Sequence, residues 1–304
     1  MKEPNFFIIG APKCGTTSIA NWLGQCPGVF LPTLKEPNYF NADRRVYDRL
    51  EPHEYQHLFH RATESHIAVG EASTAYLRSS IAVPNILRYA PRAKFICCVR
   101  NPVTMCVSWH KQNLTDGVEQ ERSFERAWTL QAERASGHRI PNLCADGGDL
   151  LYGPVCKIGS QLRRAVTAAG RDNVLVISLD DIAAQPLTVY NQVLSFLGIS
   201  NNFTPEFQRY NKAIYLPRPI ARGLLYARLI KRRLRIDLPT GMARLAVKAF
   251  AQEASIGEPS DHFLRSVLYP YFAGEVDILE SILDQDLSAW REPPSVGPIR
   301  ATVT

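Results

Sequence analysis

The sequence lacks the cysteine pattern of a disulfide-stabilised or zinc-binding protein. Its seven cysteines are odd in number, and no two of them form a C-x-x-C pair. Several lie inside apolar runs, among them Cys97 and Cys98 in the segment AKFICCV. A disulfide framework has an even number of cysteines, and zinc ligands have paired spacing. We therefore expect buried free thiols and no metal site.

The chain also lacks any apolar run of the roughly 20 residues that a membrane-spanning helix needs. No basic segment followed by a long apolar stretch precedes the first apolar run, which begins at Asn5. Together with the unpaired cysteines, these two absences lead us to expect a cytoplasmic protein.

Acidic residues are missing from residues 218–235, which carry seven basic residues. The 304-residue chain has a formal net charge of +6, so the chain outside this stretch carries −1. No broad basic face or aromatic-basic motif accompanies the stretch, which argues against a nucleic-acid partner. Leucines and isoleucine interleave with the cations and favour an amphipathic helix. That helix is either a solvated surface or a contact for an anionic acceptor or an anionic membrane surface.

Short, dense apolar runs alternate with helical patterns, which is typical of strands buried on both faces of a parallel sheet. We expect strands at residues 5–10, 29–31, 67–70, 93–99 and 173–179. We expect helices at residues 16–26, 102–114, 124–135, 157–169 and 186–197. The alternation predicts one α/β, P-loop-like domain with a central parallel sheet flanked by helices.

No repeat or low-complexity linker divides the chain. We expect one domain over residues 1–291, whose portion from about 205 to 291 is mostly helical and includes the basic stretch. Residues 292–304 begin with Glu-Pro-Pro and continue with small and polar residues, so we expect a flexible tail there.

A glycine-bounded loop joins the first expected strand to the first expected helix. Gly10 and Gly15 enclose residues 11–14, and three hydroxyl residues follow. Unpaired N–H groups and the positive end of the dipole make such a helix start an anion site. The spacing matches the P-loop G-x-x-x-x-G-K-[ST], but Thr16 stands where that motif has lysine, and the lysine is Lys13. This displacement argues against a kinase, whose lysine binds the β/γ-phosphates.

Two segments resemble the donor-binding motifs of sulfotransferases that use 3′-phosphoadenosine 5′-phosphosulfate (PAPS). Residues 12–18, PKCGTTS, resemble the 5′-phosphosulfate loop P-K-x-G-T-T-S. Residues 100–103, RNPV, with Ser108 eight residues after Arg100, resemble the 3′-phosphate segment. An arginine can direct two N–H groups at phosphate oxygens. Because ATP has no 3′-phosphate, a second anion site favours PAPS.

The resemblance covers most of the chain. Residues 34–40, LKEPNYF, are similar to the K-E-P-x-[FY]-F segment of bacterial and heparan-sulfate-type sulfotransferases. Residues 70–76, GEASTAY, are similar to their G-E-x-[ST]-P-x-Y segment, and Leu287-Ser288-Ala289-Trp290 to a common family ending. Two positions depart from the pattern, since Met105 replaces an arginine and Ala72 replaces a lysine beside the acceptor. The second departure counts against a heparan-like acceptor.

The resemblance implies that Glu36 is the base for the acceptor's hydroxyl proton and that Lys13 neutralises the leaving phosphate. The donor-binding residues that it implies are Lys13, Cys14, Gly15, Thr16, Thr17, Ser18, Arg100 and Ser108. It implies no metal, because hydrogen bonds and one lysine can stabilise a sulfuryl group, which carries less charge than a phosphoryl group. The implied acceptor is a small molecule or glycan with a hydroxyl, from a carbohydrate, a lipid or a natural product.

Other residues leave alternatives open. A histidine is a second choice of base, and four cluster in sequence: His53, His57, His60 and His66. Trp22 fits either an adenine contact or the core, and His110 fits a structural role or a minor ligand contact. Asp180 and Asp181 imitate the acidic residues of a P-loop kinase, but in the resembling family such a pair opens a helix, so we interpret them as capping residues.

Three functions are compared on this basis. The first is a PAPS-dependent sulfotransferase, the second a P-loop small-molecule kinase, and the third a binding module without catalysis. Only the glycine spacing and the acidic pair favour the kinase. Retention of Lys13 and Glu36 argues against the third function.

Overall fold

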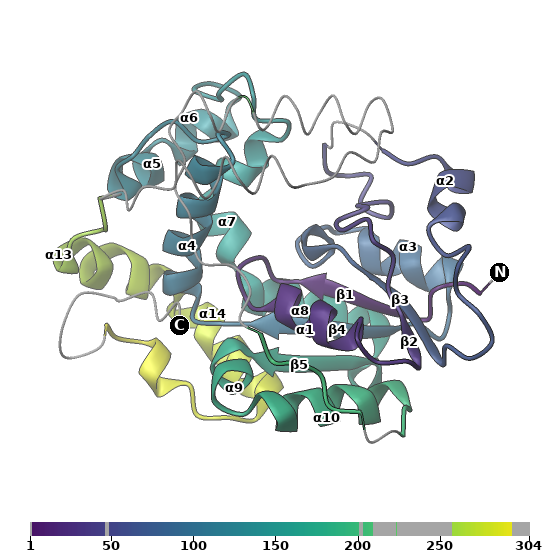
Figure 1. Cartoon of the computed structure of the whole chain (residues 1–304). Coiled ribbons are helices and arrows are strands. Elements are labelled where there is room, and N and C mark those ends of the chain that lie inside the picture. Colours follow the sequence, from purple (N-terminus) through teal and green to yellow (C-terminus); the bar gives the residue numbers. More distant parts are fainter. Residues whose placement is uncertain (1, 46–48, 201–202, 209–222, 224–256, 294–304) are drawn as a thin grey trace.

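The computed structural model of the chain describes residues 2–45, 49–200, 203–208, 223 and 257–293. Its centre is a five-stranded parallel sheet with the order β2-β3-β1-β4-β5 (Figure 1). The strands are β1 Phe6–Gly10, β2 Val29–Phe30, β3 Ala68–Ala72, β4 Lys94–Val99 and β5 Val174–Ser178. The predicted α/β fold with a central parallel sheet is confirmed, and each of the five expected strands is present.

The central strands are buried on both faces. Every residue of β1 is buried, and Phe95–Val99 of β4 have no exposed surface. Phe7 of β1 stacks on Phe95 of β4 at a ring separation of 6.1 Å. Gly70 of β3 is paired with Phe6, and a Cβ at this glycine would lie 2.5 Å from the Phe6 ring. The apolar runs therefore form a closely packed platform for the loops that follow the strands.

Helices cover both faces of the sheet. They are α1 Thr16–Leu23, α2 Pro52–His57, α3 Ala82–Tyr89, α4 Pro102–Thr115, α5 Phe124–Thr129, α6 Gln131–Ala135, α7 Tyr152–Cys156, α8 Ile158–Ala169, α9 Leu179–Ala184 and α10 Pro186–Leu197. α1 packs with α10, and α3 packs with α8. The connection from β1 to β2 through α1 and the connection from β3 to β4 through α3 run in opposite directions across the sheet. Because such connections are right-handed, the two helix pairs lie on opposite faces (Figure 1).

Helix ends follow from local sequence. The side chain of Asn101 accepts a hydrogen bond from the N–H of Val103 and caps α4, with Pro102 in the first turn. α10 ends at Gly198, which adopts a left-handed φ of 75°. The segment expected as one helix over 124–135 instead forms α5 and α6, which share Leu130 as a boundary.

The C-terminal part that the structure describes is helical. It comprises α13 Asp261–Phe263, the π turn η4 Leu264–Leu268, α14 Tyr269–Leu283 and the 3₁₀ turn η5 Ser288–Trp290. α14 packs against α8 and α4 (Figure 1). The basic stretch 218–235, apart from residue 223, and the tail residues 294–304 lie outside the described residues, so the bounds 1–291 and the flexible tail stay predictions.

The strand order places three loops together. Because β1 lies between β3 and β4 and all three are parallel, the segments that follow them meet at one edge of the sheet. In open parallel sheets, ligands bind at the carboxyl ends of strands where the chain reverses its direction across the sheet. The loop after β1 is therefore flanked by the segments after β3 and β4.

Candidate active site

The loop between β1 and α1 needs both of its glycines. Gly10 has a φ of 148°, and a Cβ there would lie 2.9 Å from the carbonyl oxygen of Thr74. Gly15 has a φ of 89° and precedes α1, and a Cβ there would lie 2.9 Å from Ile182. Residues that have a side chain rarely adopt such a φ, and neither position has room for a Cβ atom. The first turn of α1 follows directly, with the hydroxyls of residues 16–18 at the positive end of its dipole.

Lys13 lies within this loop and is bonded to α4. Its Nζ donates to Oε1 of Gln112 at 2.9 Å, and Nε2 of Gln112 donates to Oδ2 of Asp116 at 3.0 Å. Burial lowers the pKa of Lys13, nearby Asp116 opposes this effect, and Arg100 adds to it. The sequence motifs do not single out Gln112. The available signal is its spacing, since it lies one helical turn after Ser108.

Arg100 follows β4 and lies against the same loop. Its Nη1 donates to the carbonyl oxygen of Lys13 at 3.1 Å, and its Nε donates to the hydroxyl of Thr104 at 3.1 Å. Burial lowers the pKa of Arg100, and the charge of nearby Asp180 opposes this effect. The structure thus brings together Lys13 and Arg100, while Ser108 lies half-buried further along α4.

Glu36 is held by the segment that follows β3. The N–H of Thr74 donates to Oε2 of Glu36 at 2.8 Å, and the Thr74 hydroxyl donates to Oε1 at 3.0 Å. The carbonyl of Thr74 also lies close to Gly10, at the start of the β1–α1 loop. Because Thr74 binds the Glu36 carboxylate, that carboxylate is anchored beside the start of the loop. Burial raises the pKa of Glu36, whereas the two Thr74 bonds and the charge of Arg78 lower it.

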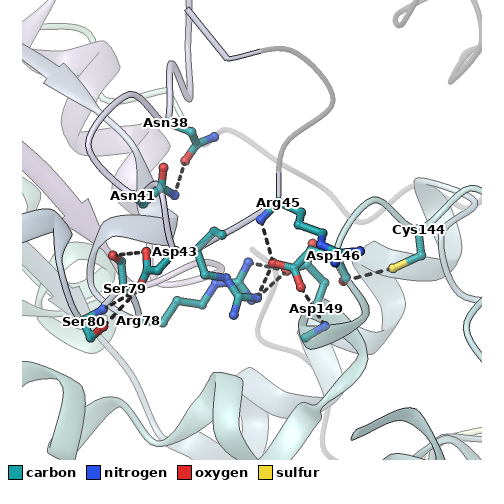
Figure 2. A network of polar contacts seen from close by, with 12 residues as sticks. Asn38, Asn41, Asp43, Arg45, Arg78, Ser79, Ser80, Cys144, Asp146 and Asp149 are labelled. Carbon is teal, nitrogen blue, oxygen red and sulfur yellow. Dashed lines mark hydrogen bonds and ion pairs between the residues drawn. The ribbon is translucent and has the colours of Figure 1, made fainter. Parts of the chain in front are cut away.

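Arg78 belongs to a charged network at this side of the site. Figure 2 shows Arg78 pointing toward Asp149, with which it forms an ion pair. Arg44 lies 2.8 Å from Asp146 and 3.5 Å from Asp149. The network joins the segment after Glu36 to the segment after β3 and to the loop around the 3₁₀ turn η2 Gly147–Leu150. The two arginines are therefore compensated by two carboxylates.

The C-terminal turn η5 touches the segment after β4. The indole Nε1 of Trp290 donates to Asp180 at 3.1 Å, and the Asn101 side chain donates to the Trp290 carbonyl at 3.3 Å. Asp180 is therefore a partner of Trp290 and not a cap, because the N-cap of α9 is Ser178, whose hydroxyl accepts from the N–H of Asp181. Both acids still lie in the first turn of α9, where the helix dipole stabilises them.

The structure places Trp22 in the core. Trp22 is 4% exposed, and its ring packs edge-on against Phe207 with centroids 4.9 Å apart. This arrangement favours the core interpretation of the tryptophan. His110 is fully buried, and its Nε2 is 2.8 Å from the carbonyl oxygen of Glu121, which agrees with a structural role.

Three of the four clustered histidines make local contacts. The rings of His57 and His60 stack at 4.4 Å and both residues are exposed, and His66 is bonded to Thr63. His53, at the start of α2, is also exposed. Glu36, in contrast, is anchored beside the start of the β1–α1 loop.

The cysteines lie in the described part of the chain and are not paired with one another. All seven cysteines are free thiols, and six of them are buried, as expected. Within the described ranges, no three His, Cys, Asp or Glu side chains are grouped to hold a metal ion. No helix in the same ranges is both long enough and apolar enough to cross a membrane.

Comparison with known proteins identifies the family. The family described as "Sulfotransferase domain" matches residues 3–217. The chain belongs to this family. The sulfotransferase domain thus includes the β1–α1 loop, Glu36 and Arg100, and the resemblance on which the site assignments depend is confirmed at the level of the family.

Two curated proteins that are similar to this chain have heparan sulfate in their names. Human bifunctional heparan sulfate N-deacetylase/N-sulfotransferase 1 is 23% identical over 218 residues, which cover 65% of this chain and 22% of the relative. Mouse heparan sulfate glucosamine 3-O-sulfotransferase 6 is 26% identical over 219 residues, which cover 68% of this chain and 56% of the relative. The chain therefore spans about a fifth to about half of the length of these relatives.

A solved bacterial structure matches the whole sulfotransferase domain. The sulfotransferase from Alicyclobacillus acidocaldarius superimposes with a TM-score of 0.71 at 27% identity, covering 96% of this chain and all of the other. This likeness shows that the chain has the fold of a known sulfotransferase structure.

Proposed function

We propose that this chain transfers the sulfuryl group of PAPS to an acceptor hydroxyl. The observation that carries the proposal is the contact of Arg100, from the end of β4, with the carbonyl oxygen of Lys13 in the loop after β1. This contact holds Arg100 against the loop that carries Lys13, at the start of a helix, and the charge of Arg100 is near enough to lower the pKa of Lys13. Two cations so placed suit a donor with a phosphosulfate and a separate 3′-phosphate.

The residues present suit PAPS as a bound substrate. The first turn of α1 and its hydroxyl residues would bind the 5′-phosphosulfate, with the loop residues Cys14 and Gly15 contributing backbone N–H groups. Arg100 and Ser108 would bind the 3′-phosphate. Lys13 would neutralise the charge that develops on the bridging oxygen as the bisphosphate leaves. Its hydrogen bond to Gln112 would hold the ammonium group in position for this role.

Glu36 would accept the proton of the attacking hydroxyl. Its carboxylate is fixed by two hydrogen bonds from Thr74, and burial raises its pKa, which makes it a stronger base than an exposed glutamate. A base that is held in place contributes about 10²–10⁴-fold to the rate. The hydroxyl oxygen then forms its bond to sulfur in line with the bond to the departing phosphate oxygen.

The acceptor proposed is a small molecule or glycan hydroxyl, from a carbohydrate, a lipid or a natural product. Ala72 lies where the heparan-type relatives have lysine. Arg78, whose charge lowers the pKa of Glu36 more than that of Lys35 does, is paired with Asp149. Both features favour an acceptor that is uncharged close to its reacting hydroxyl. The basic stretch 218–235 lies outside the described residues, except for residue 223, and remains a proposed contact for an anionic part of the acceptor or for an anionic membrane surface.

The donor is tested by thermal denaturation with nucleotides. Adenosine 3′,5′-bisphosphate, added without Mg²⁺, should raise Tm more than ADP or ATP does, because only the bisphosphate occupies both anion sites. The same nucleotides with Mg²⁺ serve as the control. Equal stabilisation by Mg-ATP would support the P-loop kinase instead.

A further inference from the structure

The segment that carries Glu36 adopts an unfavourable backbone conformation twice. Glu36 has a φ of 53° and Asn38 a φ of 52°, and neither residue is glycine. Each left-handed residue costs about 1–2 kcal/mol relative to a right-handed one. Such residues persist only where surrounding groups hold them. The turn that aims the Glu36 side chain must therefore be held by specific contacts.

Two hydroxyl groups bind the backbone of this turn. The N–H of Asn38 donates to the hydroxyl oxygen of Ser73 at 3.1 Å. The N–H of Tyr39 donates to the hydroxyl oxygen of Tyr76 at 3.0 Å. Ser73 and Tyr76 are both buried and both belong to the segment after β3 that also holds the Glu36 carboxylate through Thr74. A hydroxyl that accepts these N–H groups must point its own hydrogen elsewhere.

Both hydrogens point at one buried carboxylate, that of Glu71. The Tyr76 hydroxyl donates to Oε1 of Glu71 at 2.8 Å, and the Ser73 hydroxyl donates to Oε2 at 2.9 Å. Tyr55 adds a third donor to Oε1 at 3.1 Å. Glu71 has no exposed surface. An ionised carboxylate only accepts hydrogen bonds, so it orients both hydroxyls with their oxygens toward the turn.

We propose that Glu71 is a positioning residue for Glu36, acting by orienting the hydroxyls of Ser73 and Tyr76 so that they hold the turn at Asn38 and Tyr39. This role rests on the proposed function, since it supposes that Glu36 is the base. It differs from a purely structural role in its consequence. Loss of the orientation displaces the Glu36 carboxylate while the donor site, which is built on β1 and β4, stays in place.

Three tyrosines provide a matched set of variants. In Tyr76→Phe the ring stays, and one of the two hydroxyls that bind the turn is lost, together with its contacts to the N–H groups of Tyr39 and Phe40. In Tyr55→Phe the same Glu71 oxygen loses a donor, but the turn keeps both hydroxyls. Tyr152, whose hydroxyl donates to another buried carboxylate, Glu119, at 2.6 Å, supplies a control at a separate cluster.

The measurements are kcat, Kd for adenosine 3′,5′-bisphosphate, and Tm, all at pH 8. We expect Tyr76→Phe and Ser73→Ala each to lower kcat about tenfold, the equivalent of one net hydrogen bond, with Kd within about twofold of wild type. Tyr55→Phe and Tyr152→Phe should keep kcat within about twofold even where Tm falls by a similar amount.

Two results would overturn the proposal. One is wild-type kcat in both Tyr76→Phe and Ser73→Ala, and the other is an equal loss of kcat in the two control tyrosine variants. Glu36→Gln separates this failure from failure of the proposed function. If Glu36→Gln keeps wild-type kcat, the base assignment falls and the positioning role falls with it. If Glu36→Gln is inactive and Tyr76→Phe is fully active, only the positioning role is wrong.

Discussion

Glu71→Gln should change how the stability of the protein depends on pH. Burial, with a smaller contribution in the same direction from nearby Glu36, raises the pKa of Glu71 from an ordinary value of 4.5 to about 7. The hydroxyls of Ser73, Tyr55 and Tyr76 act in the opposite direction but do not cancel the effect of burial. The folded protein therefore binds a proton at Glu71 over a pH range in which the unfolded chain has lost it.

The sign and size follow from linkage. A group that binds its proton more tightly in the folded state contributes a free energy of unfolding that is present below about pH 4.5 and is lost as the pH rises to about 7. A difference of this size corresponds to a loss of about 3 kcal/mol across that interval. Glutamine has no proton to lose, so the variant should lack this part of the pH dependence.

The assay is urea denaturation of wild type and Glu71→Gln without ligand, at intervals from pH 4.5 to 8. The quantity compared is the difference in unfolding free energy between the two proteins at each pH, since all other titrating groups contribute to both. We expect the difference to shift by up to about 3 kcal/mol in favour of the variant as the pH rises. Parallel curves for the two proteins would refute a raised pKa at Glu71.

Three further predictions concern the donor site and the acceptor. Arg100→Ala should weaken adenosine 3′,5′-bisphosphate binding by about 1.5–3 kcal/mol in calorimetry, and an alanine at the exposed Arg163 should not. Gly15→Ala should destabilise the protein by about 1–3 kcal/mol more than Gly198→Ala, because both have a positive φ but only Gly15 has neighbours at 2.9–3.0 Å. Urea denaturation of the two variants checks this, and Gly15→Ala should have the lower midpoint. Acceptor KM should rise with salt, and neutralising residues 232–233 should flatten the rise; a KM independent of salt would contradict this prediction.

The elements that could be predicted from sequence are those whose signal is local. β1 and β4 are short runs of apolar residues, and α10 has both a clear 3.6-residue period and a glycine stop, so its bounds Pro186–Leu197 agree with the prediction. The β1–α1 loop, with both of its glycines, is contiguous in the chain. The predicted helices include neither α2 nor α3. The local signal for α2 is only the capping box between Glu51 and Glu54, and Pro84 in the first turn of α3 obscures its helical pattern.

The rest of the site depends on residues that the fold brings together. Gln112 is 99 residues from Lys13, and Thr74 is 38 residues from Glu36. No periodicity or motif connects such pairs. The burial of Glu71 could not be predicted either, because a lone glutamate in a sequence is ordinarily exposed, and only the packing of two tyrosines over it reveals the buried carboxylate.

The hydrogen bond between Asn101 and Trp290 affects the order in which parts of the protein can fold during its synthesis. The two residues are separated by 189 positions, and Trp290 also binds Asp180 beside the segment that carries Arg100. At about 5–20 residues per second, a ribosome needs roughly 10–40 s to travel from the first of these residues to the second. A nascent chain can form its sheet and its β1–α1 loop during that interval, but the hydrogen bond from the segment after β4 to η5 forms only after residue 290 has left the ribosome. Binding of the bisphosphate to stalled nascent chains should therefore increase in strength late in synthesis, well after the strands themselves have formed.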